Sequence, residues 1–324
     1  MKSQIEPHVY EAAHNTAIVT DRSDLGLLKI RGQTRLDLIH RMSTQGVKNL
    51  KSGEGAATVL TTEIGRIIDR LTLYASSDTV YALTGEENAD NIARYLMGYV
   101  FFNDDFHVEN ISDDTAIFAV YGPRAAQMLA ENLGFPEVEI PLHHWREAEI
   151  AGVSAYLHRT EPIAGAGYYV MCTNEARDLI WQQLLDAGFV VADEPAFDFL
   201  RIASGLPRYG HELTGDYIPL EADLWSDVSF SKGCYIGQEI IARMESRGQL
   251  AKKLLRFALE HPVSDGTEIK ADGKRAGTIT SVGVGPEGAR ALGYLKTSIL
   301  SEQAVLTADG AELQVLYEPE PEAT

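Results

Sequence analysis

The chain has 324 residues, of which 45% are apolar, and its formal net charge is −19. This composition is typical of a globular protein with two or three domains. Because an acidic chain repels phosphate backbones, we expect no nucleic-acid partner. No segment approaches the roughly 18 consecutive apolar residues of a membrane-spanning helix, and the first residues resemble neither a signal peptide nor a transit peptide. We therefore expect no membrane association.

The two cysteines, Cys172 and Cys234, have neither the spacing of a zinc site nor that of a disulfide scaffold. Their low number favours a reducing, cytoplasmic compartment. Cys172 lies in an apolar, strand-like segment (YYVMC), which predicts a packing role for its side chain.

The first 190 residues or so alternate between strand-like and helix-like segments. Periodicity predicts strands at 25–31, 56–62, 66–75, 79–84, 115–121, 149–157 and 168–172. It predicts helices that are capped by Thr34, that begin near 88 and after Pro123, and that are capped by Asn174. The order aromatic strand, polar cap, amphipathic helix occurs twice, which suggests two related α+β subdomains.

From about residue 250 the pattern changes to short strands separated by turn residues, which is typical of a small all-β sandwich or barrel. The glycines of 281–285 (SVGVG) predict a turn within it. The charged, proline-interrupted residues 319–324 predict a disordered tail. The predicted domains are an N-terminal α+β domain at 1–114, a second α+β domain at 115–194 and the small all-β domain at 249–318.

The densest motif of the chain is 231–239 (SKGCYIGQE). Glycines on both sides of Cys234 allow tight turns and a close approach of the backbone to a ligand. A helix predicted just after the cysteine, together with the nearby Lys232, would favour the thiolate form. The alternative is that Cys234 is a small, buried apolar residue. The residue types leave both interpretations open.

A second candidate is Asp69, in the strand-like run EIGRIIDRLTLY. If Asp69 shares a buried face with Ile67 and Leu71, its carboxylate needs a partner or has a raised pKa. It would then be a candidate general base or amine-binding group. If Ile68 and Arg70 face inward instead, Asp69 is solvated, and the pattern alone does not decide.

Residues 230–243, FSKGCYIGQEIIAR, closely resemble the signature of the YgfZ-like proteins of the YgfZ/GcvT family. These are folate-binding relatives of the glycine-cleavage T-protein, an aminomethyltransferase. The long N-terminal block and the runs LRIASGLPRYGHEL, IPLEADLW and GTITSVG are similar to further family blocks in the same order. The resemblance implies an α+β fold in which two ferredoxin-like subdomains and a small C-terminal β-barrel form a ring around a central folate pocket. It also implies that 195–248 completes the N-terminal domain.

The resemblance assigns roles to single residues. Asp69 matches the T-protein aspartate that faces the folate amine and the transferred one-carbon unit. Arg201 matches a pocket arginine, suited to a carboxylate or to the polar edge of a pterin, and Glu221 matches a motif glutamate. Tyr169 stands where T-proteins have a pterin-binding glutamate. Cys234 is shared with the YgfZ-like branch, whereas T-proteins generally lack it.

The candidate site residues follow from the motifs and the resemblance together. Cys234 and Asp69 are the candidate catalytic residues, and no metal ligand is expected. The candidate cofactor-binding residues are Asp69, Arg201, Glu221, Tyr169, Lys232, Gln238 and Glu239.

The resemblance implies that tetrahydrofolate is the cofactor, and three functions are compatible with it. The first is an accessory role in the assembly or repair of iron–sulfur enzymes, with Cys234 as a redox or transfer thiolate near the pocket rim. The second is a folate-dependent aminomethyl or methyl transferase that uses Asp69, and the third is a folate-binding module without chemistry. The expected partners are folate and iron–sulfur enzymes or assembly proteins, and the chain is expected to be a monomer. An anionic folate on an acidic protein also predicts a local concentration of Lys and Arg, with Arg201 central.

Overall fold

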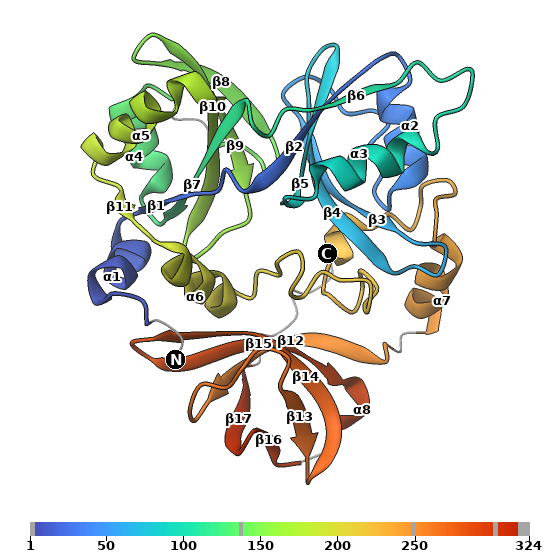
Figure 1. Ribbon diagram of the computed structural model, residues 1–324, viewed down its shortest axis with the longest axis vertical. Helices are drawn as coiled ribbons and strands as arrows, with labels where there is room; N and C mark the ends of the chain where they lie inside the picture. The colour runs from blue at the N-terminus through green and yellow to red at the C-terminus, as the bar shows by residue number, and fades with distance from the viewer. Residues whose placement is uncertain (1–3, 136–138, 248–249, 301–303, 317–324) are drawn as a thin grey trace.

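Backbone hydrogen bonds pair the strands into two open sheets and one closed barrel. The computed structural model describes residues 4–135, 139–247, 250–300 and 304–316. Two α+β lobes lie side by side, and the barrel lies below them (Figure 1). The predicted mixed α+β fold with a small C-terminal barrel is therefore confirmed.

The first lobe contains an antiparallel sheet in the order β3-β4-β5-β2-β6. The strands are β2 (Leu25–Arg31), β3 (Gly55–Thr61), β4 (Ile67–Ala75), β5 (Thr79–Glu86) and β6 (His107–Asn110). Helices α2 (Arg35–Met42) and α3 (Ala89–Met97) cover one face of this sheet. Their apolar sides pack on the strands in a core that includes Leu28, Leu71 and Ile92.

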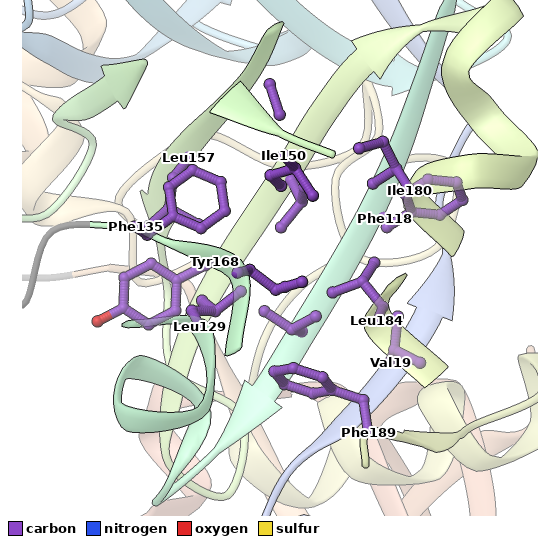
Figure 2. Packing of buried hydrophobic residues seen from close by; sticks show 14 of the residues in the cluster. Val19, Phe118, Leu129, Phe135, Ile150, Leu157, Tyr168, Ile180, Leu184 and Phe189 are labelled. Carbon is purple, nitrogen blue, oxygen red and sulfur yellow. The ribbon is translucent and has the colours of Figure 1, made fainter. Parts of the chain in front are cut away.

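The second lobe contains a sheet in the order β11-β1-β7-β10-β9-β8. The strands are β1 (Ile18–Asp21), β7 (Thr115–Gly122), β8 (Trp145–Ile150), β9 (Val153–Thr160), β10 (Ala166–Thr173) and β11 (Val190–Val191). Helices α4 (Ala125–Leu133) and α5 (Arg177–Asp186) pack on it. Figure 2 shows Phe118, Leu129 and Ile180 among the buried side chains of this core. Cys172 is buried in the same core, as its apolar strand predicted.

Three local predictions in these lobes are wrong. The expected strand at 149–157 is a hairpin, because positive φ angles at Ala151 and Gly152 turn the chain between β8 and β9. The hydroxyl of Thr34 donates to the carbonyl of Asp105 at 2.9 Å instead of capping α2. Asn174 begins a short 3₁₀ turn, η1 (Asn174–Ala176), and makes no side-chain cap.

Residues 1–114, expected to form one domain, contribute to both sheets. Helix α1 (Pro7–Asn15) and β1 lie with the second lobe, where β1 pairs with β7 and with β11. The segment 195–248 returns to the first lobe, as two of its hydrogen bonds there show. The hydroxyl of Thr44 donates to the carbonyl of Asp227 at 2.6 Å, and the backbone N–H of Ile67 donates to Tyr217 at 3.0 Å.

The third lobe is a closed barrel in the order β12-β15-β14-β13-β16-β17. Its elements are β12 (Lys252–Leu259), β13 (Glu268–Ala271), β14 (Lys274–Gly285), β15 (Gly288–Lys296), the short helix α8 (Thr297–Leu300), β16 (Leu306–Ala308) and β17 (Ala311–Leu316). Closing the sheet leaves no unpaired edge, which suits a small all-β unit. The tail expected at 319–324 lies outside the described residues.

The glycines of 281–285 belong to β14 and do not form the predicted turn. They lie where helix α6 (Glu194–Ser204) crosses the barrel. A β-carbon added at Gly285 would lie 2.1 Å from the ring of Phe199, and one at Gly283 would lie 2.9 Å from the Cα of Phe199. Glycine is therefore required here for close packing of a helix on a strand.

After α6 the chain crosses the centre of the molecule (Figure 1). This connection contains the 3₁₀ turn η2 (Trp225–Asp227) and ends in helix α7 (Gln238–Arg247), beside the first lobe. Of the described helices, none is long and apolar enough to cross a membrane.

We predict that Gly285→Ala destabilises the protein, because the added methyl group meets the buried ring of Phe199. Overpacking of this kind costs about 1–3 kcal/mol in the free energy of unfolding, which urea unfolding would measure. Gly46→Ala is the matched control, since nothing lies within 4 Å of a β-carbon there. Equal stability of the two variants would contradict the packing role of Gly285.

Candidate functional site

The two α+β lobes, α6 and the segment after α6 enclose a central cavity of about 90 Å³. Its polar walls carry arginines and carboxylates, and its apolar walls combine leucines with aromatic side chains. The residues that the argument below uses are Arg22, Asp69, Arg70, Gly85, Glu86, Tyr121, Glu161, Tyr169, Phe197, Arg201, Arg208 and Tyr209.

Asp69 lies on β4 at the wall of this cavity and is fully buried. Its neighbours Ile67 and Leu71 are also buried, so the first of the two sequence interpretations is confirmed. Burial raises the pKa of Asp69 to about 6, against the opposing effect of its hydrogen bonds. One carboxylate oxygen accepts from the backbone of Arg70 at 2.7 Å; the other accepts from Asn88 at 2.9 Å and from the backbone of Gly85 at 3.0 Å.

Arg70 follows Asp69 and connects three segments that are distant in the sequence. Its Nε donates to Asp227 at 2.6 Å, and its guanidinium also pairs with Glu161 in the link between β9 and β10. Burial alone would raise the pKa of Glu161, but the charges of Arg70 and His143 and the hydrogen bonds of the carboxylate together outweigh burial and lower that pKa to about 2. Arg70 therefore ties both α+β lobes to the crossing segment by charge.

A second charged group lies at another side of the cavity. Arg22 donates to Glu86 at 2.6 Å and stacks on the ring of Phe197, with its guanidinium carbon 4.3 Å from the ring centre. Arg208 donates to the same carboxylate at 2.7 Å and also pairs with Glu194. The predicted local concentration of basic residues is present among the described lining residues as Arg22, Arg70, Arg201 and Arg208, and each of these arginines is paired with a carboxylate.

Arg201 lines the cavity, but its guanidinium is committed to protein partners. It donates to Asp198 at 2.8 Å, to Glu212 at 2.6 Å and to Ser281 at 2.6 Å. The side chain is 1% exposed. A buried guanidinium with three such partners holds α6 on the barrel, which is a structural role.

The other residues expected at the cofactor lie in different places. Tyr169 lines the cavity, and burial raises the pKa of its phenol. Glu221 is buried outside the lining, where its carboxylate accepts from the backbone of Ile218 at 3.2 Å and lies 3.6 Å from Arg66.

The motif around Cys234 lies outside the cavity lining. Cys234 is exposed, so the alternative of a small buried residue is wrong. Gln238 and Glu239 open α7, and Glu239 pairs with Arg243 on the same helix. None of the three lines the cavity in the described part of the chain.

Lys232 anchors this motif to the first lobe. Its ammonium donates to the backbone carbonyls of His40 and Ser43, each at 2.5 Å, and of Gln45 at 3.1 Å. These carbonyls surround the C-terminal end of α2, where a cation is favoured. Burial lowers the pKa of Lys232 to about 8. The lysine thus fixes the position of the Cys234 loop.

Sequence reasoning missed Arg22, Glu86, Glu161, Arg208 and Tyr209, although all of them line the cavity. Each stands at the end of a strand or in a connection, where charged and aromatic residues are common. The GLPRYGHEL run is similar to a family block, and this similarity could have indicated Arg208 and Tyr209 as well as the nearby Arg201. At the position of Tyr169 this chain differs from T-proteins, which have a glutamate there. A carboxylate is nevertheless close by, because Glu161 lines the cavity together with Tyr169.

Two family models match this sequence. The GCVT N-terminal domain matches residues 5–232, and the CAF17 C-terminal beta-barrel domain matches residues 252–319. The chain belongs to the YgfZ/GcvT family. The resemblance stated from the sequence motifs is confirmed.

Relatives of known name agree with this family. A chloroplastic protein of Arabidopsis thaliana, whose name assigns it provisionally to the transferases, is 29% identical over 90% of this chain and 68% of its own. The aminomethyltransferase of Caldanaerobacter subterraneus is 29% identical over 84% of this chain and 74% of its own. The crystal structure of the glycine cleavage system aminomethyltransferase T from Bartonella henselae superposes with a TM-score of 0.83. It covers 98% of this chain and 90% of its own at 21% identity, which supports the same fold.

We predict that the pair of Arg70 and Glu161 stabilises the protein at neutral pH and loses this effect in acid. Because the pKa of Glu161 is lowered to about 2, its contribution is complete above its ordinary value of about 4.3 and disappears as the pH falls toward 2. The shift corresponds to about 3 kcal/mol. Urea unfolding of the wild type and of Glu161→Gln between pH 7 and pH 2 should show curves that converge in acid.

The exposed Glu175 offers a matched control. Glu175→Gln should leave the pH dependence of stability parallel to that of the wild type. A difference between wild type and Glu161→Gln that stays constant down to pH 2 would contradict the role of the pair.

Proposed function

We propose that the protein binds tetrahydrofolate in the central cavity and serves as an accessory protein in the assembly or repair of iron–sulfur enzymes. The observation that carries the folate part is Asp69, a buried carboxylate at the cavity wall with a pKa near 6. The relation of the family to aminomethyltransferases supports a folate-related role.

The chemistry of the cavity fits a reduced folate. A pterin is a flat ring with N–H donors along one edge, and the carboxylates of Asp69 and Glu161 can accept from such donors. Tyr121, Tyr169 and Phe197 offer aromatic surfaces beside them. When bound, tetrahydrofolate would supply a nitrogen that carries a one-carbon unit. The Asp69 carboxylate would accept a proton from the ligand or hold one on its own oxygen.

Binding requires the cavity to widen. Its volume of about 90 Å³ is below the roughly 300–1,000 Å³ typical of sites for drug-sized ligands. Glu194 is 54% exposed and pairs with Arg208 at the cavity wall. An anionic glutamate tail would compete with Glu194 for this arginine, because surface ion pairs are weak. This exchange would use Arg208, one of the four arginines that line the cavity, to bind the anionic tail.

The accessory role depends on Cys234. Its side chain is exposed on a loop that Lys232 fixes to the first lobe, so the thiol is accessible to another protein. In this proposal Cys234 acts at the surface as a redox or transfer thiolate, and the cavity supplies folate binding. A cytoplasmic location and a monomeric state belong to the same proposal.

A second candidate function is a folate-dependent aminomethyl or methyl transferase. Asp69 favours it, because a carboxylate with a pKa near 6 can exchange a proton at neutral pH. Formation of methylene- or methyl-tetrahydrofolate by the purified protein with an amine donor would favour the transferase over the accessory role. Loss of that turnover in Asp69→Asn would place Asp69 in the reaction.

We predict that tetrahydrofolate binding, measured by calorimetry, weakens as the pH falls through 6. Above this pH Asp69 is ionised and accepts a charge-assisted hydrogen bond from the ligand, whereas below it the carboxyl is neutral. Such a bond is worth roughly 10- to 100-fold in affinity. Asp69→Asn should bind weakly at every pH between 5 and 8.

The control for this experiment is Asp113→Asn, a substitution of an exposed aspartate, which should bind as the wild type does. Absence of measurable tetrahydrofolate binding to the wild-type protein would contradict the proposal. Equal affinity of Asp69→Asn and wild type would remove Asp69 from the site.

We predict that Cys234→Ala lowers the activity of iron–sulfur enzymes in cells that carry the variant as their sole copy. The substitution removes the exposed thiol but changes no buried contact. The affinity for tetrahydrofolate should be unchanged, because Cys234 is outside the cavity lining. The control is Cys172→Ala, which removes the thiol of a buried cysteine and should leave the activity of iron–sulfur enzymes unchanged.

Normal iron–sulfur enzyme activity in Cys234→Ala cells would contradict the accessory role. If Asp69→Asn were also silent in cells while the wild type binds tetrahydrofolate, the protein would be a folate-binding module without chemistry.

A further inference from the structure

The segment 205–213, which follows α6, forms one wall of the central cavity, and we call it the cavity loop. Gly205 and Gly210 both have positive φ angles, of 80° and 77°, which reverse the chain at its start and near its end. Arg208 and Tyr209, between these glycines, both line the cavity.

Tyr209 lies directly against the strand that holds Asp69 in place. A β-carbon at Gly85 would lie 2.3 Å from the ring carbon Cγ of Tyr209, so the ring rests on the Gly85 backbone. The N–H of the same glycine donates to Asp69 at 3.0 Å. Burial, and after it the charges of Asp69 and Glu86, raise the pKa of the Tyr209 phenol.

The other end of the cavity loop is fixed to the barrel through Glu212. This carboxylate is fully buried and accepts from the hydroxyls of Thr280 at 2.5 Å and Ser281 at 2.6 Å, both on β14. It also accepts from Arg201 at 2.6 Å and from the backbone of Arg208 at 3.0 Å. A buried carboxylate with four donors holds one position, because losing a partner leaves a buried charge unpaired.

We propose that Tyr209 is a positioning residue that closes the Asp69 end of the central cavity, and that the barrel holds it there through Glu212. The inference rests on the proposed function only in treating the cavity as the ligand site. It gives the barrel a role at the cavity, although none of the described lining residues belongs to the barrel.

The environment of Asp69 follows from this arrangement. Charged and titratable groups from several elements line the cavity together with Asp69. They are Arg70 on the same strand, Glu86 on β5, Arg208 and Tyr209 in the crossing segment, and Arg22 and Glu161 in the connections of the lobes. Tyr209 differs from the rest because its uncharged ring packs on the backbone of Gly85, whose N–H donates to Asp69. Removing the ring admits water to Asp69 without changing any charge nearby.

The first experiment measures the pKa of Asp69 without a ligand, by NMR of ¹³C-labelled aspartate carboxyls, with Asp69→Asn to assign the signal. In Tyr209→Ala the value should fall from about 6 toward the ordinary aspartate value of about 3.9. Tyr209→Phe, which keeps the ring, should retain the wild-type value. An unchanged Asp69 value in Tyr209→Ala would overturn the proposal.

Gly85→Ala tests the same contact from the opposite side. The added methyl group displaces the Tyr209 ring and keeps the backbone N–H that binds Asp69. It should lower the Asp69 value as Tyr209→Ala does. A wild-type value in a folded Gly85→Ala variant would show that the ring does not control Asp69, and would overturn the proposal.

The second experiment tests the anchor by amide hydrogen exchange. The amides of Glu212 and Leu213 donate to the carbonyl of Arg208 at 3.1 and 3.0 Å. In Thr280→Val they should exchange roughly tenfold faster, because Glu212 loses a charge-assisted hydrogen bond. Thr280→Ser keeps the hydroxyl and should restore slow exchange.

Thr278→Val, on the same strand, is the matched control and should leave the cavity loop unchanged. Unchanged exchange in Thr280→Val, or an equal increase in Thr278→Val, would overturn the anchoring role. Neither experiment uses folate. If the wild type failed to bind tetrahydrofolate, the proposed function would be contradicted, but the results of these two experiments would still decide the role of Tyr209.

Discussion

Arg70 lies between Asp227 and Glu161, and its burial with these partners determines how the chain closes on itself. The three residues come from β4, from the crossing segment and from the link between β9 and β10. The Arg70 side chain is 16% exposed, and a charge that is largely removed from water is costly unless it is paired. The two α+β lobes and the crossing segment are therefore held in one relative position, which forms the cavity beside Asp69.

A second buried group connects the barrel to this arrangement. Arg201 and Glu212 are almost fully buried, and both donate to or accept from Ser281 on β14. The family resemblance suggests a cofactor contact for Arg201, which lines the cavity and also belongs to this buried pair. Buried ion pairs of this kind specify one arrangement of lobes more than they add stability. In the proposed function, Asp69, Glu161, Arg208 and the aromatic side chains of the cavity wall are the groups that contact the ligand.

The Cys234 motif and the cavity are separate features of the molecule. Lys232 holds the motif at the end of α2, and Cys234 points to the surface. A lysine near a cysteine in the sequence suggested an activated thiolate, but the ammonium has carbonyl partners of its own. The arrangement is compatible with a protein that binds a small molecule in one place and presents a thiol to a partner in another.

The sequence by itself determined the alternation of strands and helices, the change to an all-β unit after residue 250 and the family, through the motif at 230–243. It did so because periodicity and short motifs are local properties of a chain. It could not decide whether Asp69 faced inward, since both registers of β4 fitted the pattern equally. It also misread the glycines of β14 as a turn, because the reason for them is the ring of Phe199 on a distant helix. Only the tertiary structure brought Glu161, Arg208 and Tyr209 to Asp69, because their contacts join residues that lie from about 90 to about 140 positions apart in the sequence.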